Sequence, residues 1–146
     1  MINKVEMMGD IERVLFSAEQ IQERVKEGGA QISKDYYGKN PVVVGIQKGV
    51  DPFYAAMTQA ITIPLEEDFM CVSSYEGTES TGKIILRKDV DVSLRDRHVL
   101  ILEDILDSGR TLKAIVEMLK DRKPASVKIC TLFDKPEGRK IPLTAE

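Results

Sequence analysis

Short apolar runs alternate with amphipathic stretches along the chain. The runs at 42–46, 69–73, 99–102 and 127–133 are rich in β-branched and other apolar residues and end near turn residues, a pattern that predicts β-strands. Residues 83–87 predict a returning strand. Apolar residues at helical spacing predict helices that begin near residues 17, 51 and 111.

The ends of the predicted helices carry local signals. Ser17 and Gln20 have the spacing of a capping box, in which each side chain bonds the other residue's backbone N–H. Gly28-Gly29 lies inside the same helix and predicts a kink or close packing against another element. Asp51 is expected to cap the second helix, with Pro52 at its first position.

The order of these elements predicts the fold class. Strands separated by helical segments are typical of βαβ units, with right-handed crossovers and a mostly parallel sheet. A length of 146 residues fits one domain, so we expect a single α/β domain over residues 1–146. Residues 74–82, rich in Ser, Thr, Glu and Gly, predict an exposed loop.

Composition and charge narrow the classes of function. Hydrophobic residues make up 42% of the chain and charged residues 31%, which excludes a disordered protein. The formal net charge is -3, and no basic block could follow a phosphate backbone. The apolar runs are much shorter than the roughly 18 residues of a membrane span, and the N-terminus does not resemble a signal peptide. We expect a cytoplasmic protein that binds neither nucleic acid nor membrane.

Candidate chemistry follows the predicted strand at 99–102. In a parallel sheet, ligands bind at the carboxyl ends of the strands. Ser108, Gly109 and Thr111 predict a tight loop whose N–H groups point at one position, and the next helix adds the positive end of its dipole. The carboxylates of Glu103 and Asp104 suit the hydroxyls of a ribose or a bound Mg²⁺. A phosphorylated sugar fits both halves; a receiver-like acidic pocket and a purely structural turn are the alternatives.

Residues 99–111 resemble the phosphoribosyl diphosphate (PRPP) binding motif of the type I phosphoribosyltransferases. That motif has four apolar residues, two acidic residues, two apolar residues, Asp, Ser or Thr, Gly, any residue and Thr, and this sequence meets every position. The resemblance implies a Rossmann-like α/β fold. In that fold a mostly parallel central sheet is flanked by helices, and a mobile loop lies over the active site.

Further segments resemble the hypoxanthine (6-oxopurine) branch of that family. Lys48-Gly49 resembles the end of a Leu-Lys-Gly loop that binds diphosphate, with Gln47 in place of the Leu. Ser74-Tyr75 resembles the start of the mobile loop that closes over the reaction centre and excludes water. Lys135 matches the family lysine that hydrogen-bonds the purine 6-oxo group.

The resemblance implies purine salvage: Mg²⁺-dependent transfer of phosphoribosyl from PRPP to hypoxanthine or guanine, which gives IMP or GMP and diphosphate. It makes Asp107 the general base near purine N7, Lys135 the purine-binding residue, and Ser74 and Tyr75 the lid. Mg²⁺ would be held by Glu103 and Asp104. The implied PRPP-binding residues are Lys48, Gly49, Glu103, Asp104, Asp107, Ser108, Gly109, Arg110 and Thr111.

The resemblance also implies a departure and a partner. Family members continue past the position of Glu146 into a further strand and loop, so we expect this C-terminal part of the purine and Mg²⁺ site to be absent from residues 1–146. The family forms homo-oligomers, dimers or tetramers. The alternative functions are a non-catalytic sensor of PRPP or nucleotide, a truncated inactive core, and a phosphoacceptor signalling domain that uses the acidic residues.

Overall fold

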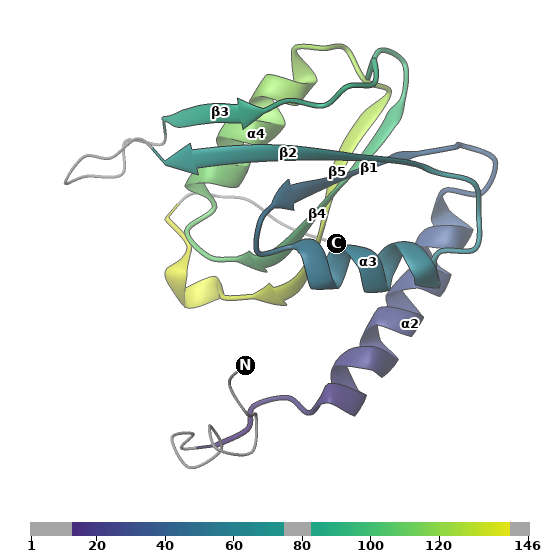
Figure 1. Cartoon of the computed structure of the whole chain (residues 1–146), viewed down its shortest axis with the longest axis vertical. Coiled ribbons are helices and arrows are strands. Elements are labelled where there is room, and N and C mark those ends of the chain that lie inside the picture. The colour runs from purple at the N-terminus through teal and green to yellow at the C-terminus, as the bar shows by residue number, and fades with distance from the viewer. Residues whose placement is uncertain (1–12, 75–82, 141–146) are drawn as a thin grey trace.

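A single five-stranded sheet forms the centre of the computed structural model, which describes residues 13–74 and 83–140 (Figure 1). The strand order is β3-β2-β1-β4-β5. Strand β3 runs antiparallel to β2, and the other neighbours are parallel, which confirms the predicted mostly parallel sheet. The strands are β1 (Val42–Gln47), β2 (Glu66–Ser74), β3 (Ile84–Lys88), β4 (His98–Leu106) and β5 (Ser126–Asp134).

Helices cover both faces of this sheet. Helices α2 (Ala18–Asp35) and α3 (Asp51–Ala60) pack on one face, and α4 (Arg110–Lys120) packs on the other (Figure 1). A short 3₁₀ helix, η2 (Pro136–Gly138), follows β5. The apolar core is therefore divided by the sheet into two halves. The fold is the α/β arrangement that the alternation of strands and helices predicts.

Strand β1 is the centre of this core. Val42, Val43 and Val44 are fully buried, because side chains that point to opposite faces both meet a helical layer. Burying each such side chain stabilises the fold by roughly 1.5–3 kcal/mol. Gly45, on the same strand, leaves room for the Tyr54 ring. A Cβ on Gly45 would lie 2.6 Å from Cδ2 of that ring. The Tyr54 hydroxyl donates a 2.7 Å hydrogen bond to the Val43 carbonyl, which ties α3 to the strand.

Local signals account for the start and the packing of α2. Ser17 and Gln20 form the predicted capping box, with both reciprocal hydrogen bonds present. Gly29 packs so closely on α3 that a Cβ would lie 2.5 Å from the Cβ of Ala60. The glycine pair therefore serves close helix–helix packing, which was one of its two predicted roles.

The predicted cap of α3 is wrong. Asp51 is the first residue of the helix, and the N-cap is Val50, which makes no side-chain cap hydrogen bond. The Asp51 N–H donates to the Lys48 carbonyl at 3.2 Å, which closes the turn between β1 and α3. The helix therefore has its N-cap one residue earlier than predicted. Buried Val50 holds this position by apolar packing instead of polar capping.

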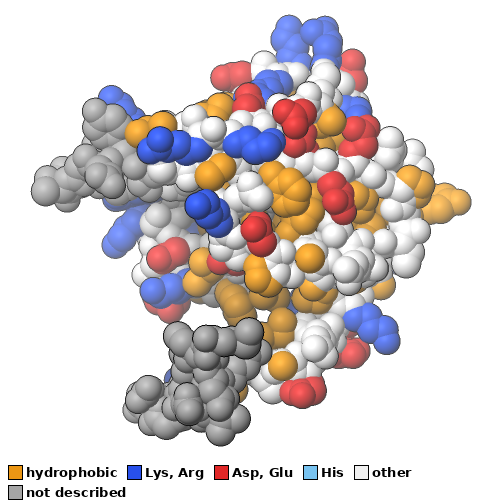
Figure 2. Space-filling model, in the orientation of Figure 1, with side chains coloured by type: hydrophobic (Ala, Val, Ile, Leu, Met, Phe, Trp, Pro, Cys, Tyr) orange, Lys and Arg blue, Asp and Glu red, His pale blue; other side chains and the backbone are white. Residues whose placement is uncertain are grey.

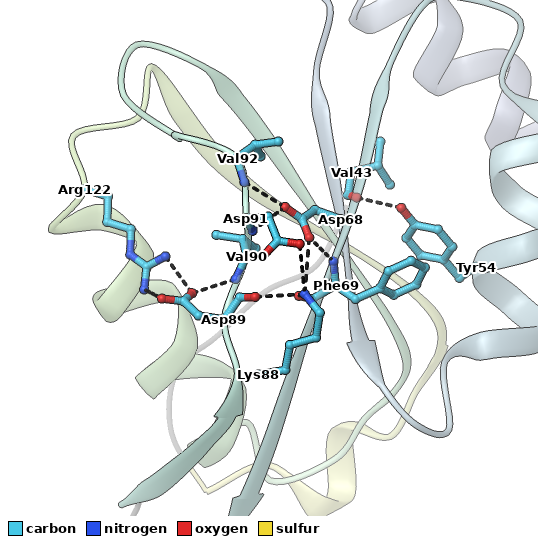
Figure 3. A network of polar contacts seen from close by, with 10 residues as sticks. All are labelled: Val43, Tyr54, Asp68, Phe69, Lys88, Asp89, Val90, Asp91, Val92 and Arg122. Carbon is cyan, nitrogen blue, oxygen red and sulfur yellow. Dashed lines mark hydrogen bonds and ion pairs between the residues drawn. The ribbon is translucent and has the colours of Figure 1, made fainter.

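A buried carboxylate fixes the connection between β3 and β4 (Figure 3). Asp68, on β2, is 6% exposed and accepts hydrogen bonds from the backbone N–H groups of Phe69, Asp91 and Val92. Burial raises its pKa, but these donors and the Lys88 ammonium outweigh that effect and hold the pKa below its usual value. The network holds the chain after β3 against β2.

The strand order excludes the phosphoacceptor signalling domain. Receiver domains have the doubly wound order 2-1-3-4-5 with parallel strands. Here the second and third strands along the chain form an antiparallel pair, and β1 lies beside β4. That alternative from the sequence is therefore wrong.

The surface charge in Figure 2 is mixed, and the described helices are short or polar. On the face shown in Figure 2, acidic and basic side chains are interspersed. Within residues 13–74 and 83–140, no helix has the length and apolar character to cross a membrane.

Candidate active site

The carboxyl ends of β1 and β4 form the candidate site. From β1 the chain continues to β2 on one side of the sheet, whereas β4 lies on the other side of β1. This reversal is the topological switch point at which open α/β sheets bind ligands. The site lies toward the left of Figure 1, where η2 also lies.

The loop after β1 touches the acidic strand β4. An added Cβ on Gly49 would lie 2.8 Å from Asp104 Oδ2, so only glycine fits beside this carboxylate without a shift. The peptide bond between Gln47 and Lys48 is cis. Lys48 and Gly49 are exposed, and the buried Val50 anchors the loop from below. The structure thus brings together two segments that the sequence separates by more than fifty residues.

Glu103 and Asp104 lie inside β4, not in the loop after it as the apolar run at 99–102 suggested. The strand continues to Leu106 because β5 supplies a partner as far as Asp134. The carboxylates accept from neighbouring backbone N–H groups: Asp104 N–H donates to Glu103 Oε1 at 3.0 Å, and Ile105 N–H donates to Asp104 Oδ1 at 2.9 Å.

Burial and the neighbouring Asp104 oppose the ionisation of Glu103. Burial, and then the adjacent Asp104, raise the pKa of Glu103 from 4.5 to about 8. A bound cation would relieve this repulsion. Among residues 13–74 and 83–140, no group of three or more His, Cys, Asp or Glu side chains could hold a metal ion. Mg²⁺ is commonly bound through one or two carboxylates together with water and substrate phosphates, so the pair fits an ion of this kind.

The loop from Asp107 to Gly109 leads directly into α4. Gly109 is the N-cap, with φ +81°, a left-handed conformation that favours glycine. No side-chain cap hydrogen bond is present at this N-terminus, although the Arg110 N–H donates to Ser108 Oγ at 3.3 Å. Backbone N–H groups and the positive end of the helix dipole therefore face the carboxyl edge of the sheet, where an anion can bind.

The segment after β5 lies along this loop. Lys135, which is exposed, donates its backbone N–H to the Leu106 carbonyl at 2.9 Å. A Cβ on Gly138 would lie 1.8 Å from Asp107 Oδ1, so η2 and the Asp107 carboxylate are in close contact. The structure therefore brings the predicted purine lysine and the predicted base to neighbouring positions.

One of the two predicted lid residues, Ser74, is the last residue of β2. Ser74 pairs there with Ile84 of β3, three residues past Cys71, the last residue of β2 that pairs with β1. Tyr75 and the rest of the expected loop to residue 82 lie outside the described residues.

A cavity of about 590 Å³ is separate from this site. It lies between α2 and the strands β4 and β5, and its walls include Val25, Met57 and Cys130. None of the site residues predicted from the sequence lines it.

Sequence reasoning missed three residues of this edge. Ile105 has an apolar side chain that is 44% exposed, and it lies between Asp104 and Leu106, two residues before Asp107. The motif has an apolar residue at this position, beside the acidic pair, and that apolar position was the available signal. Gly138 and Arg139 contact Asp107 from the segment after β5, and no local pattern marks them.

The similarity to a known family extends beyond this site to most of the chain. The model of the phosphoribosyl transferase domain family matches residues 15–144. The chain belongs to the phosphoribosyltransferase family, a class of transferase enzymes.

Within that family its relatives are of one kind. The chain is 51% identical over 138 residues to the hypoxanthine-guanine phosphoribosyltransferase of Streptococcus pneumoniae. The aligned region covers 94% of this chain and 77% of that protein. The crystal structure of a hypoxanthine phosphoribosyltransferase from Staphylococcus aureus superposes with a TM-score of 0.94 at 48% identity, over 100% of this chain and 79% of that one.

A further solved relative carries a ligand. The hypoxanthine phosphoribosyltransferase from Trypanosoma cruzi, in complex with the product IMP, has a TM-score of 0.86 at 39% identity. The match covers 92% of this chain and 77% of that protein. The recognition of the 6-oxopurine branch from sequence is confirmed.

Proposed function

We propose that the protein transfers the phosphoribosyl group of PRPP to N9 of hypoxanthine or guanine, giving IMP or GMP and diphosphate. The observation that carries this proposal is the contact between the Gly49 loop and Asp104 at the switch point, directly beside the Asp107–Gly109 loop. Anion-binding backbone and sugar-binding carboxylates then share one edge. The relative in complex with IMP supports the purine as acceptor.

PRPP would be bound by its two ends. Backbone N–H groups from Asp107 to Thr111, with the hydroxyls of Ser108 and Thr111, would hold the 5′-phosphate, because this loop presents donors at a helix N-terminus. Arg110 belongs to the same turn. Lys48 and Gly49 would bind the diphosphate at the opposite side of the acidic pair. The ribose lies between them, and its hydroxyls would face Glu103 and Asp104.

Mg²⁺ would be held by Glu103 and Asp104 together with substrate oxygens, and when bound it would neutralise the leaving diphosphate. The position of the two carboxyl groups on consecutive residues of β4 supports this part of the proposal, because Mg²⁺ is commonly bound through one or two carboxylates together with substrate phosphates. The carboxylates themselves would orient the ribose.

The reaction is a displacement at the ribose anomeric carbon, C1′. Purine N9 forms the new bond to C1′, and the bond from C1′ to the diphosphate oxygen breaks, with its electron pair leaving on diphosphate. Positive charge develops on the ribose in the transition state, so the carboxylates beside it stabilise that state. Asp107, exposed at the end of β4, would accept the purine proton at N7 as N9 attacks.

The purine would be recognised from the β5 side. Lys135 is exposed and directly follows the strand that pairs with β4, so its ammonium can donate to the 6-oxo group. The 6-amino group of adenine cannot accept such a bond. Ile105 would supply an apolar surface for the purine ring, since its exposed side chain lies between the acidic pair and Asp107. Ser74 and Tyr75 would form the lid.

The test is IMP formation from hypoxanthine, PRPP and Mg²⁺ by this chain, beside a calorimetric titration with PRPP. Turnover supports the proposal. PRPP binding without turnover would replace it with a nucleotide sensor or an inactive core, and the absence of both would overturn the proposed PRPP site. Omitting Mg²⁺ tests the metal, and sedimentation tests the expected dimer or tetramer. A cytoplasmic location is also part of the proposal.

A further inference from the structure

The guanidinium of Arg139 joins the phosphate loop to the end of β5. Its Nε donates a 3.0 Å hydrogen bond to the backbone carbonyl of Asp107, 32 residues earlier in the chain. A terminal nitrogen of the same group is paired with the carboxylate of Asp134, the last residue of β5. The Arg139 side chain is 18% exposed, whereas that of Asp134 is 51% exposed.

Two backbone hydrogen bonds flank this bridge. The Lys135 N–H donates to the Leu106 carbonyl at 2.9 Å, and the Lys140 N–H donates to the Ser108 carbonyl at 2.9 Å. The carbonyls of three consecutive residues, Leu106 to Ser108, therefore all accept from the segment after β5. The middle one accepts from the Arg139 side chain, and the residues between Lys135 and Arg139 form the turn of η2.

We propose that Arg139 is a positioning residue that sets the orientation of Asp107. The bond to the Asp107 carbonyl fixes the peptide plane that follows the residue, and the fixed plane limits where the Asp107 carboxylate can point. Gly138 leaves the space into which that carboxylate fits. Arginine suits this role because its planar fork can donate to a carbonyl and a carboxylate at once, which a lysine ammonium does less well.

The inference rests on the proposed function, because it assigns Asp107 a part in the transfer. If Asp107 moves by about 1 Å, the expected loss is on the order of 10²-fold in turnover. The proposed effect on turnover passes through Asp107, so removing the bridge should have little further effect on turnover once the Asp107 carboxylate is gone. PRPP affinity depends more on the loop N–H groups, which the two flanking hydrogen bonds still hold.

The chain contains a matched control at the other end of the sheet. Arg97 also bridges a carboxylate and a backbone carbonyl: it donates to Glu66 Oε1 at 2.7 Å and to the Asn40 carbonyl at 2.9 Å. Its side chain is 25% exposed, close to the value for Arg139. Arg97 precedes β4, whereas Arg139 follows β5. Removing Arg97 therefore tests the loss of a similar bridge away from the site.

The first experiment is a double-mutant cycle on the full chain. Arg139→Ala is expected to lower kcat by at least about 10-fold with KM for PRPP within about threefold, and Arg97→Ala to leave kcat within about twofold. In an Asp107→Ala background, Arg139→Ala is expected to cost less than about twofold. Equal factors in both backgrounds, or an unchanged kcat for Arg139→Ala, would overturn the inference.

The second experiment does not need activity. Amide hydrogen exchange of Lys135 and Lys140, whose N–H groups donate to the Leu106 and Ser108 carbonyls on either side of the bridge, is measured in the free chain for wild type, Arg139→Gln and Arg97→Ala, with exchange in β1 as the measure of global stability. Arg139→Gln is expected to raise exchange at Lys135 and Lys140 by about 10-fold more than in β1. Equal changes in the two regions, or none, contradict the bridge. If wild type lacks turnover, the proposed function fails and this exchange result alone decides the bridge.

Discussion

Gly138 and the carboxylate of Asp107 lie so close that a methyl group on Gly138 would come within 1.8 Å of Asp107 Oδ1. Because no rotation of a methyl group relieves such a contact, Gly138→Ala must move the carboxylate or the 3₁₀ turn. We expect turnover to fall by on the order of 10²-fold, the cost of misplacing a reacting group by about 1 Å. Steady-state kinetics measures this. Gly28→Ala, which meets only the flexible end of Met57, is the control and should retain turnover.

Gly49→Ala tests the diphosphate side of the site. Its methyl group would lie 2.8 Å from Asp104 Oδ2, so the loop and the carboxylate must separate. We expect KM for PRPP to rise by about 10-fold, equivalent to about 1.4 kcal/mol of binding, with a smaller change in KM for the purine. Initial rates at varied PRPP measure this. A KM for PRPP equal to that of wild type would remove Gly49 from the diphosphate loop.

Asp107→Ala tests the proposed general base. Loss of the carboxylate should lower kcat by about 10²-fold or more, the usual scale of general acid–base catalysis. Asp121→Ala is the control, since Asp121 is exposed at the C-terminal end of α4. Rapid-quench measurement of the chemical step is the assay. Equal rates for the two variants would exclude Asp107 as the base.

Lys135→Ala tests purine recognition. Removing the ammonium deletes one charged hydrogen bond to the 6-oxo group, so KM for hypoxanthine should rise by about 10- to 100-fold. PRPP binding, measured by calorimetry, should change by less than about threefold. Lys26→Ala, at an exposed position of α2, is the control. Equal losses for purine and PRPP would contradict the division between the two subsites.

Glu103 predicts how stability depends on pH. Its pKa is raised from 4.5 to about 8, so between these values the folded chain keeps a proton that the unfolded chain has released. The free energy of unfolding therefore falls as pH rises through this range, by at most about 1.4 kcal/mol per pH unit from this group. Urea unfolding in metal-free buffer between pH 5 and 8 measures the slope.

Glu103→Gln should flatten that slope, because an amide does not titrate. Glu117→Gln is the control, since Glu117 is an exposed residue of α4. Adding Mg²⁺ and PRPP should favour the ionised Glu103 and reduce the slope for wild type. Identical slopes for wild type and Glu103→Gln would show that the carboxyl group ionises normally.

Sequence reasoning predicted the sheet and its helices because each depends on residues close together in the chain. The three valines of β1 can be buried on both faces only in a covered strand, and the structure buries all three. Ser17 and Gln20 satisfy each other within one turn. The loop at Gly109 has the required left-handed backbone. The site residues could be named because the motif that carries them is contiguous.

Where sequence reasoning failed, the deciding contact was distant. The apolar run at 99–102 gave no reason for β4 to include Glu103 and Asp104; pairing with β5 extends the strand to Leu106. Asp51 is a good capping residue by type, yet the buried packing of Val50 sets the start of α3.

The sequence by itself determined the α/β elements, the family and the segments that carry the chemistry, because these are properties of local pattern. Only the tertiary structure decided that Gly49 contacts Asp104 and that Gly138 and Arg139 hold Asp107. The register of β4 on β5 brings Leu106 beside Asp134, and the residues that follow each strand then meet. That register is set by burial across the whole sheet, so no stretch of sequence near Asp107 or Arg139 specifies it alone.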